Sequence, residues 1–203
     1  MFIWPLLVVS VSSQTPTALE RRLSAAYCSE DELGNCQLRW PEKPPPRVAE
    51  FDCVWDATVK CTQTLAGSPP LVALARDELI KAGLPVDEPR VFVEALRVRA
   101  EWTVVHAYHH RVSGERMSLA SVVLMLRDDG TRLVLRTQRF THAALDGPST
   151  VRLHFVMDVR DVDGDGGAEL VLNGEGYEAH WLEVFTLRGE KWRLLFSGLG
   201  YSL

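Results

Sequence analysis

A short acidic run, Asp158 to Leu172 (DVRDVDGDGGAELVL), constrains the fold of this 203-residue chain more than any other stretch. Carboxylates this close together repel one another unless a cation lies among them. The alternation of Asp161, Asp163 and Asp165 would point their oxygens toward one centre, and the interspersed glycines allow the backbone to wrap around it. The run therefore predicts a metal-binding loop, 158–169, that leads directly into a β-strand.

The ligand types in this loop favour calcium. Hard oxygen ligands in a flexible loop suit Ca²⁺, and the run has no Cys or His to select zinc or copper. An EF-hand loop begins with the same acidic spacing but needs a bidentate Glu at its twelfth position, which is Leu172 here. The nearest acid is Glu169, and the sequence continues as a strand. A solvated Asp-Gly hairpin turn without a metal is the alternative.

This spacing of acids and glycines resembles the calcium loops of FG-GAP and VCBS-type repeats, known from integrin α-subunit propellers and many bacterial surface proteins. The resemblance covers only about the last quarter of the chain. It implies that Asp161, Asp163, Asp165 and Glu169 are side-chain ligands of Ca²⁺ and that Gly167 offers its carbonyl oxygen. The chain departs from the family in having one acidic loop, whereas a propeller needs typically 4–8 blades.

Composition excludes some classes of protein. The net charge is −5, and arginines in the middle of the chain are interleaved with acids, which argues against nucleic-acid binding. The hydrophobic fraction of 46% is sufficient for a folded core. No apolar run is long enough to cross a bilayer as a helix of the mature chain.

The N-terminus has the pattern of a secretory signal peptide. Met1 to Val11 is apolar, and Ser12 and Ser13 supply small residues before a cleavage site, which predicts a signal peptide over 1–13. The usual positive charge at the start is missing, and an ordinary N-terminal strand is the alternative. We expect a secreted or periplasmic protein.

The four cysteines fall within an N-terminal segment, 14–66. Four cysteines permit three pairings, and both successive pairs have seven intervening residues. We expect Cys28–Cys36 and Cys53–Cys61 disulfides, with Cys28–Cys61 plus Cys36–Cys53 as the second choice. Export favours disulfides, and a zinc site is disfavoured because no C-x-x-C pair is present.

Two helices are predicted. The first, 15–27, begins with Thr17 as N-cap and Glu20 three residues later, which is a capping-box pattern. The second, 68–83, begins with a serine followed by two prolines and ends at Gly83, with its apolar residues on one face. We expect this second helix to cover one face of a sheet.

The rest of the chain has the alternation of β-strands. The segment between Cys53 and Cys61 is expected to be one short strand. Further strands are expected at 91–99, 101–109, 118–126, 132–136, 151–157 and 169–172, with a looser stretch at 141–150. The last two strands, 181–187 and 192–196, are expected to form a hairpin that buries Trp181 or Trp192.

A weak internal repeat relates residues 125–135 to residues 186–196, and residues 100–105 to residues 168–172. The predicted fold is therefore mainly β with a minor α part. We expect a domain over 67–203 with a twisted antiparallel sheet, divided into two propeller-blade-like units if the repeat is real. One helix covers this sheet, and a disulfide-bonded N-terminal segment precedes it.

Other motifs resemble cofactor or catalytic sites. Gly174 to Ala179 matches a dinucleotide fingerprint, but a strand follows where a helix is required, so a glycine loop is expected. His106 and His109 would point to opposite faces of one strand and are expected to be partly exposed. The candidate acid–base pairs are His142 with Asp146, and His180 with Glu178 or Glu183.

These patterns support several functions. The first is a non-enzymatic, exported, calcium-binding β domain with a binding or structural role toward a protein or glycan partner at the periplasm or cell surface. The alternatives are a small secreted hydrolase with structural calcium and a subunit of a larger surface assembly. A pocket joining His180 or His142 to a carboxylate with a shifted pKa would favour the hydrolase. A large exposed apolar patch would favour binding or assembly.

Overall fold

The structure is a computed structural model, and it confirms the mainly β, antiparallel class. The predicted signal peptide lies outside the described residues. Among those residues, no helix is long and apolar enough to cross a membrane. The described residues are 17–30, 36–43, 45, 47–55, 59–63, 69–83, 90–113, 116–143, 152–176 and 179–200.

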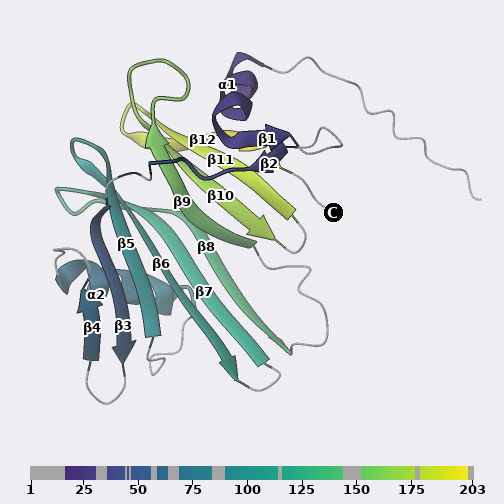
Figure 1. Cartoon of the computed structure of the whole chain (residues 1–203). Helices are drawn as coiled ribbons and strands as arrows, with labels where there is room; N and C mark the ends of the chain where they lie inside the picture. Colours follow the sequence, from purple (N-terminus) through teal and green to yellow (C-terminus); the bar gives the residue numbers. More distant parts are fainter. Residues whose placement is uncertain are drawn as a thin grey trace, which may run out of the picture.

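Within these ranges the strands form three antiparallel sheets (Figure 1). A six-stranded sheet has the order β4-β3-β5-β6-β7-β8, a four-stranded sheet the order β12-β11-β10-β9, and β1 pairs with β2. The strands are β1 (Cys28–Glu30), β2 (Cys36–Leu38), β3 (Arg47–Trp55), β4 (Val59–Gln63), β5 (Arg90–Arg99), β6 (Trp102–Ser113), β7 (Arg116–Arg127), β8 (Arg132–Ala143), β9 (Arg152–Arg160), β10 (Glu169–Gly176), β11 (Ala179–Arg188) and β12 (Lys191–Gly198).

The two larger sheets share one apolar core. Trp102 of β6 and Trp192 of β12 meet edge to face across it, with ring centroids 6.1 Å apart. Burial of such side chains from both sheets holds the sheets together. The other buried members are Leu96, Val98, Val104, Val123 and Met125 of the six-stranded sheet, and Val156, Leu170, Leu172 and Phe185 of the four-stranded sheet.

Each of these sheets also packs against a helix (Figure 1). Helix α2 (Pro69–Lys81) covers the six-stranded sheet with Leu74 and Leu79, as the sequence predicts. Helix α1 (Ala18–Tyr27) packs Leu23 and Tyr27 against the four-stranded sheet, which the sequence does not indicate. The outer faces of both sheets are therefore partly buried.

The helix boundaries follow from local chemistry. Thr17 accepts a hydrogen bond from the Glu20 backbone N–H at 3.2 Å, and the Glu20 carboxylate accepts one from the Thr17 backbone N–H, so the predicted capping box is present. Helix α2 ends before Gly83, whose φ of 107° is a conformation that other residues rarely adopt.

The chain from β5 onward divides into two four-stranded meanders, β5–β8 and β9–β12. The hairpins that the repeat relates, β7–β8 and β11–β12, are the last two strands of each meander. The segments 100–105 and 168–172 likewise include the first residues of the second strand of each meander, β6 and β10. The repeat thus coincides with equivalent elements of two blade-like units. β3 and β4 extend the first unit, so part of the 14–66 segment belongs to the six-stranded sheet.

Three local predictions are wrong. The segment between Cys53 and Cys61 is not one strand, because the end of β3 and the start of β4 pair with each other as two arms of a hairpin. Gly174 and Gly176 are not in a loop but in β10, where they pair with β11. The looser stretch begins later than expected, because β8 continues to Ala143.

The structure contains the predicted Cys28–Cys36 disulfide, with 5.0 Å between the two Cα atoms. The Cys53 and Cys61 side chains lie outside the described residues. Their backbones, however, are direct partners in the β3–β4 ladder, and directly opposed strand residues have Cα separations that a disulfide can span. The register is therefore compatible with the second predicted bridge.

Mass spectrometry of non-reduced, digested protein tests this pairing. We expect one peptide pair that links Cys28 to Cys36 and another that links Cys53 to Cys61. Peptides that link Cys28 to Cys61 would contradict the pairing, and free thiols at 53 and 61 in oxidised protein would contradict the second bridge.

Candidate metal centre

The acidic loop connects β9 to β10 and is folded around the side chain of Asp161. The backbone N–H groups of Gly164 and Gly166 donate to the two carboxylate oxygens of Asp161, at 2.6 and 3.0 Å. Both glycines have positive φ, 82° and 86°, which a side chain would make unfavourable. The alternation of acids and glycines is therefore what allows this loop to turn inward.

Three of the predicted ligands converge. Carboxylate oxygens of Asp161, Asp163 and Glu169 lie within 4.8 Å of one another, and the group could hold a metal ion. Asp161 is exposed, Asp163 is half-buried and Glu169 is fully buried. Oxygen donors on a glycine-rich loop match the ligand preference of Ca²⁺ and would not select a softer metal. The donor set therefore fits calcium.

Glu169 is the fully buried member of this group. Its carboxylate accepts hydrogen bonds from the Val162 backbone N–H at 3.0 Å and from the Thr186 hydroxyl at 3.1 Å. Burial raises the pKa of Glu169, and the two hydrogen bonds oppose that effect only in part. A bound cation would stabilise the charged form of this buried carboxylate.

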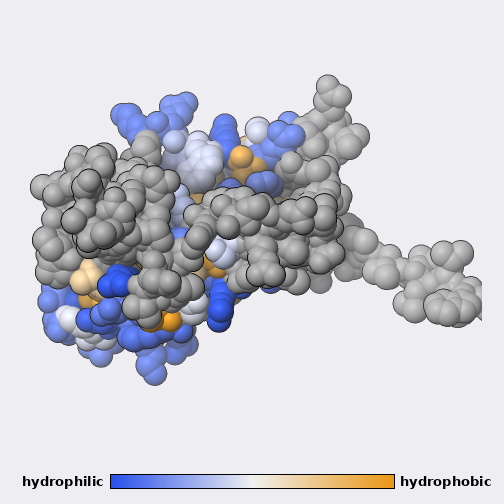
Figure 2. Space-filling view, turned by 90° about the horizontal axis from the view of Figure 1, so that it is seen from below, coloured by the Kyte–Doolittle hydropathy of each residue, from blue (hydrophilic) through white to orange (hydrophobic). Residues whose placement is uncertain are grey.

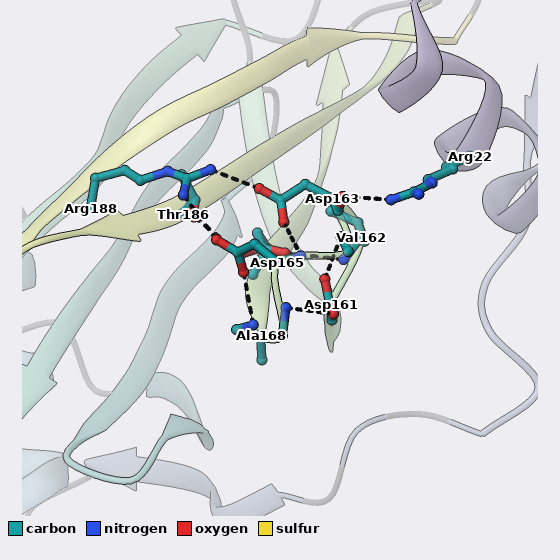
Figure 3. Close-up of polar contacts among 12 residues, drawn as sticks. Arg22, Asp161, Val162, Asp163, Asp165, Ala168, Thr186 and Arg188 are labelled. Carbon is teal, nitrogen blue, oxygen red and sulfur yellow. Dashed lines mark hydrogen bonds and ion pairs between the residues drawn. The ribbon is translucent and has the colours of Figure 1, made fainter.

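Asp165 has a different orientation from the other three acids. Arg188 at the end of β11 donates to Asp165 at 2.9 Å and to Asp163 at 2.9 Å, so one guanidinium bridges the two carboxylates (Figure 3). The Gly167 N–H also donates to Asp165, at 2.8 Å, and this bond lowers the pKa of Asp165. Asp165 and Gly167 are therefore adjacent to the converging group and are not among its three members.

Residues from other layers of the fold also contact the loop. Arg99 at the end of β5 donates to the Ala168 carbonyl at 3.0 Å and lies 3.4 Å from Glu169. Arg22 of α1 donates to the backbone carbonyl of Asp163 (Figure 3). The loop thus contacts helix α1, the six-stranded sheet and its own four-stranded sheet.

Asp158, at the start of the acidic run, connects helix α1 to strand β9. It is buried and accepts a hydrogen bond from the Tyr27 hydroxyl at 2.8 Å. Arg160 pairs with the same carboxylate and lies over the Tyr27 ring. Burial and the hydrogen bond to Asp158 raise the pKa of the Tyr27 phenol above its usual range. These contacts attach α1 to β9.

The strand histidines are more buried than the sequence indicates. His106 is 1% exposed and His109 is 2% exposed, so the expectation of partial exposure is wrong. His106 lies on the same face of β6 as Val104, toward the four-stranded sheet, and its Nδ1 is 2.9 Å from Glu94. His109 lies on the other face, which α2 covers. The alternation of a strand predicts which face of the sheet each histidine is on. It does not show that both faces of this sheet are covered by other elements.

Of the candidate acid–base pairs, His142 with Asp146 and His180 with Glu178 stay predictions. The His142 side chain, Asp146 and Glu178 lie outside the described residues. Glu183 is bound by Arg136 at 2.7 Å and lies 3.5 Å from His154. Arg136 belongs to β8 and Glu183 to β11, so this ion pair bridges the two sheets within the protein.

Sequence reasoning missed the cationic partners of the loop. Arg99 and Glu169 are 70 residues apart, and Arg188 and Asp163 are 25 apart. The sequence signal for such a partner is an arginine at the end of a strand. Several strands of this chain end in arginine, so the signal does not single out Arg99 or Arg188. Without the packing of the two sheets, no local pattern identifies which arginines reach the loop.

Comparison with known protein families, with curated proteins and with solved structures found no match for this chain.

Proposed function

We propose that this chain is an exported, calcium-binding β domain with a binding or structural role at the cell surface or in the periplasm. The observation that carries the proposal is the convergence of the Asp161, Asp163 and Glu169 carboxylates. The spacing of the loop, which resembles FG-GAP and VCBS-type repeats, and the Cys28–Cys36 disulfide are consistent with it.

In this proposal calcium stabilises the fold and does not take part in chemistry. The loop already contacts α1 and both large sheets through Arg22, Arg99 and Arg188. An ion held by the converging acids would neutralise their mutual repulsion and fix the loop to these layers. Arg188 already supplies part of the positive charge by pairing with Asp163 and Asp165, so the stabilisation that calcium adds is expected to be modest.

The alternatives have less support. For the hydrolase, Glu183, one of the two candidate partners of His180, is committed to an ion pair with Arg136 between the sheets. For the assembly, Figure 2 shows that the described residues seen from below are mostly hydrophilic, with scattered hydrophobic spots. Among the described residues, the exposed large hydrophobic side chains are Trp40, which follows β2, Leu133 and Val134 of β8, and Leu194 of β12. Such scattered residues are ordinary for a protein surface.

The melting temperature of the protein, measured with calcium and with chelator, tests the proposal. Extracellular calcium sites have dissociation constants on the order of 10⁻⁴–10⁻³ M. Millimolar Ca²⁺ then stabilises the folded state by about 0.4–1.4 kcal/mol, or about 1–5 °C in melting temperature. Mg²⁺ is expected to substitute poorly, because it prefers a rigid octahedral site.

Asp163→Asn is expected to reduce the calcium-dependent rise, because it removes a ligand charge. Asp128→Asn is the matched control, since Asp128 is an exposed acid that pairs with Arg97 outside the loop. If the wild-type melting temperature is unaffected by both calcium and chelator, the loop is an acidic turn and the proposal is wrong.

A further inference from the structure

A pocket of about 220 Å³ lies between the disulfide-bonded N-terminal segment and the four-stranded sheet. One side of the pocket is formed by residues 37–40, which are far from the acidic loop in the sequence. The other side is formed by β10 and β11, which follow that loop. Its volume is below the roughly 300–1,000 Å³ of pockets that bury drug-sized ligands, so it has room for one small ring. The lining residues are Gln37, Leu38, Trp40, Asn173, Glu175 and His180.

Trp40 gives the pocket an exposed aromatic surface. This side chain follows β2 and is 52% exposed, although a tryptophan buries a large apolar area when it is part of a core. The Cys28–Cys36 disulfide closes the β1–β2 pair that precedes it. The indole is therefore held near the sheet by a covalently restrained hairpin while much of its surface remains open to a ligand.

The opposite side of the pocket supplies polar groups from two paired strands. Glu175 of β10 and His180 of β11 are direct cross-strand partners. Asn173 is 3% exposed, and its Nδ2 donates to Glu175 at 2.8 Å. Its Oδ1 is buried and accepts no hydrogen bond from the described residues. An unpaired amide oxygen is unfavourable where it is buried, and the contact of Asn173 that bears on the pocket is its hydrogen bond to Glu175.

We propose that this pocket binds one neutral pyranose ring of a glycan, which deepens the binding role proposed above. An aromatic side chain beside amide, carboxylate and imidazole groups suits a ligand with one apolar face and a rim of hydroxyl groups. The described lining residues include Glu175 and no Lys or Arg, which disfavours an anionic sugar. Among the described lining residues Glu175 is the one carboxylate, whereas most glycosidases use two, so the proposal is binding and not hydrolysis.

The test is a titration of the full chain with methyl glycosides of glucose, galactose, mannose and N-acetylglucosamine, followed by ligand-observed NMR. Sorbitol serves as the hydroxyl-rich control without a ring, and glucosamine as the cationic control. For a single ring we expect a dissociation constant on the order of 1 mM for at least one glycoside. Trp40→Ala is expected to weaken that binding by about tenfold or more.

Leu194→Ala is the matched control, because Leu194 is an exposed apolar residue outside the pocket. It should leave the affinity unchanged. Asn173→Ala should also weaken binding, because it removes the hydrogen bond that positions the Glu175 carboxylate, and its melting temperature must be measured because Asn173 is buried. Trp40→Ala is the decisive variant, since an exposed side chain can be removed without loss of the core.

Each titration is done with calcium and with chelator, so that this proposal and the calcium proposal can fail separately. Sugar binding that persists in chelator would support the pocket even if calcium has no effect on the loop. The proposal is overturned if no glycoside binds at a concentration about tenfold above the expected dissociation constant. It is also overturned if glucosamine alone binds, or if the Trp40→Ala variant binds the glycosides as well as the Leu194→Ala variant.

Discussion

Replacing Trp192 with Ala is expected to reduce the free energy of unfolding by about 3–5 kcal/mol. Trp192 is 6% exposed and packs against Trp102 in the core that joins the two large sheets. Its removal would leave a cavity between the sheets, where the rigid strands can close the space only in part. Chemical denaturation monitored by circular dichroism measures the loss.

Two substitutions distinguish this core effect from a general effect on β12. Trp192→Phe should cost less, because it retains an aromatic ring and removes the indole N–H, which has no hydrogen-bond partner among the described residues. Leu194→Ala, at an exposed position of the same strand, should change stability by less than about 0.5 kcal/mol. A loss for Trp192→Ala as small as that of Leu194→Ala would mean that the sheets do not pack as described.

Acidification is expected to weaken the protein through Glu183. Burial alone would raise the pKa of Glu183, but the nearby His154, 3.5 Å away, and the hydrogen bond from Arg136 outweigh burial and lower the pKa to about 2 from a usual value of 4.5. A carboxylate with a depressed pKa in the folded state contributes stability that is present above pH 4.5. That stability, about 3 kcal/mol, is lost as the pH falls from 4.5 toward 2.

Glu183→Gln separates this residue from the other acids of the chain. The variant cannot titrate at this position, so its stability should fall less steeply than that of the wild type between pH 4.5 and pH 2. It should also be less stable at pH 7, because Arg136 loses its charged partner between the sheets. Parallel stability curves for the two proteins over this pH range would contradict the assigned role of Glu183.

Local signals in the sequence were sufficient for much of the secondary structure. The capping box at Thr17 depends on two residues three positions apart, and Gly83 ends α2 by its own backbone preference. The β11–β12 hairpin follows from a turn between two alternating segments. Each of these features is determined by neighbours in the chain, and so a single sequence is enough to predict it.

Features that depend on distant pairing were not predictable. The sequence does not show that α1 covers the four-stranded sheet or that β3 joins β5, because both depend on which apolar faces meet. For the same reason the acidic loop was recognised but its contacts with Arg99 and Arg188 were not. The pocket beside Trp40 combines two segments more than 130 residues apart, and neither segment has a pattern of its own.

Isothermal titration calorimetry of the metal-free full chain with Ca²⁺ tests the central claim most directly. We predict one ion per chain with a dissociation constant on the order of 10⁻⁴–10⁻³ M. Binding should be lost in Asp161→Asn, which replaces the carboxylate around which the loop folds with a neutral amide, and retained in Asp128→Asn. No saturable binding in the wild type, or equal binding in Asp161→Asn, would contradict a calcium site in this loop.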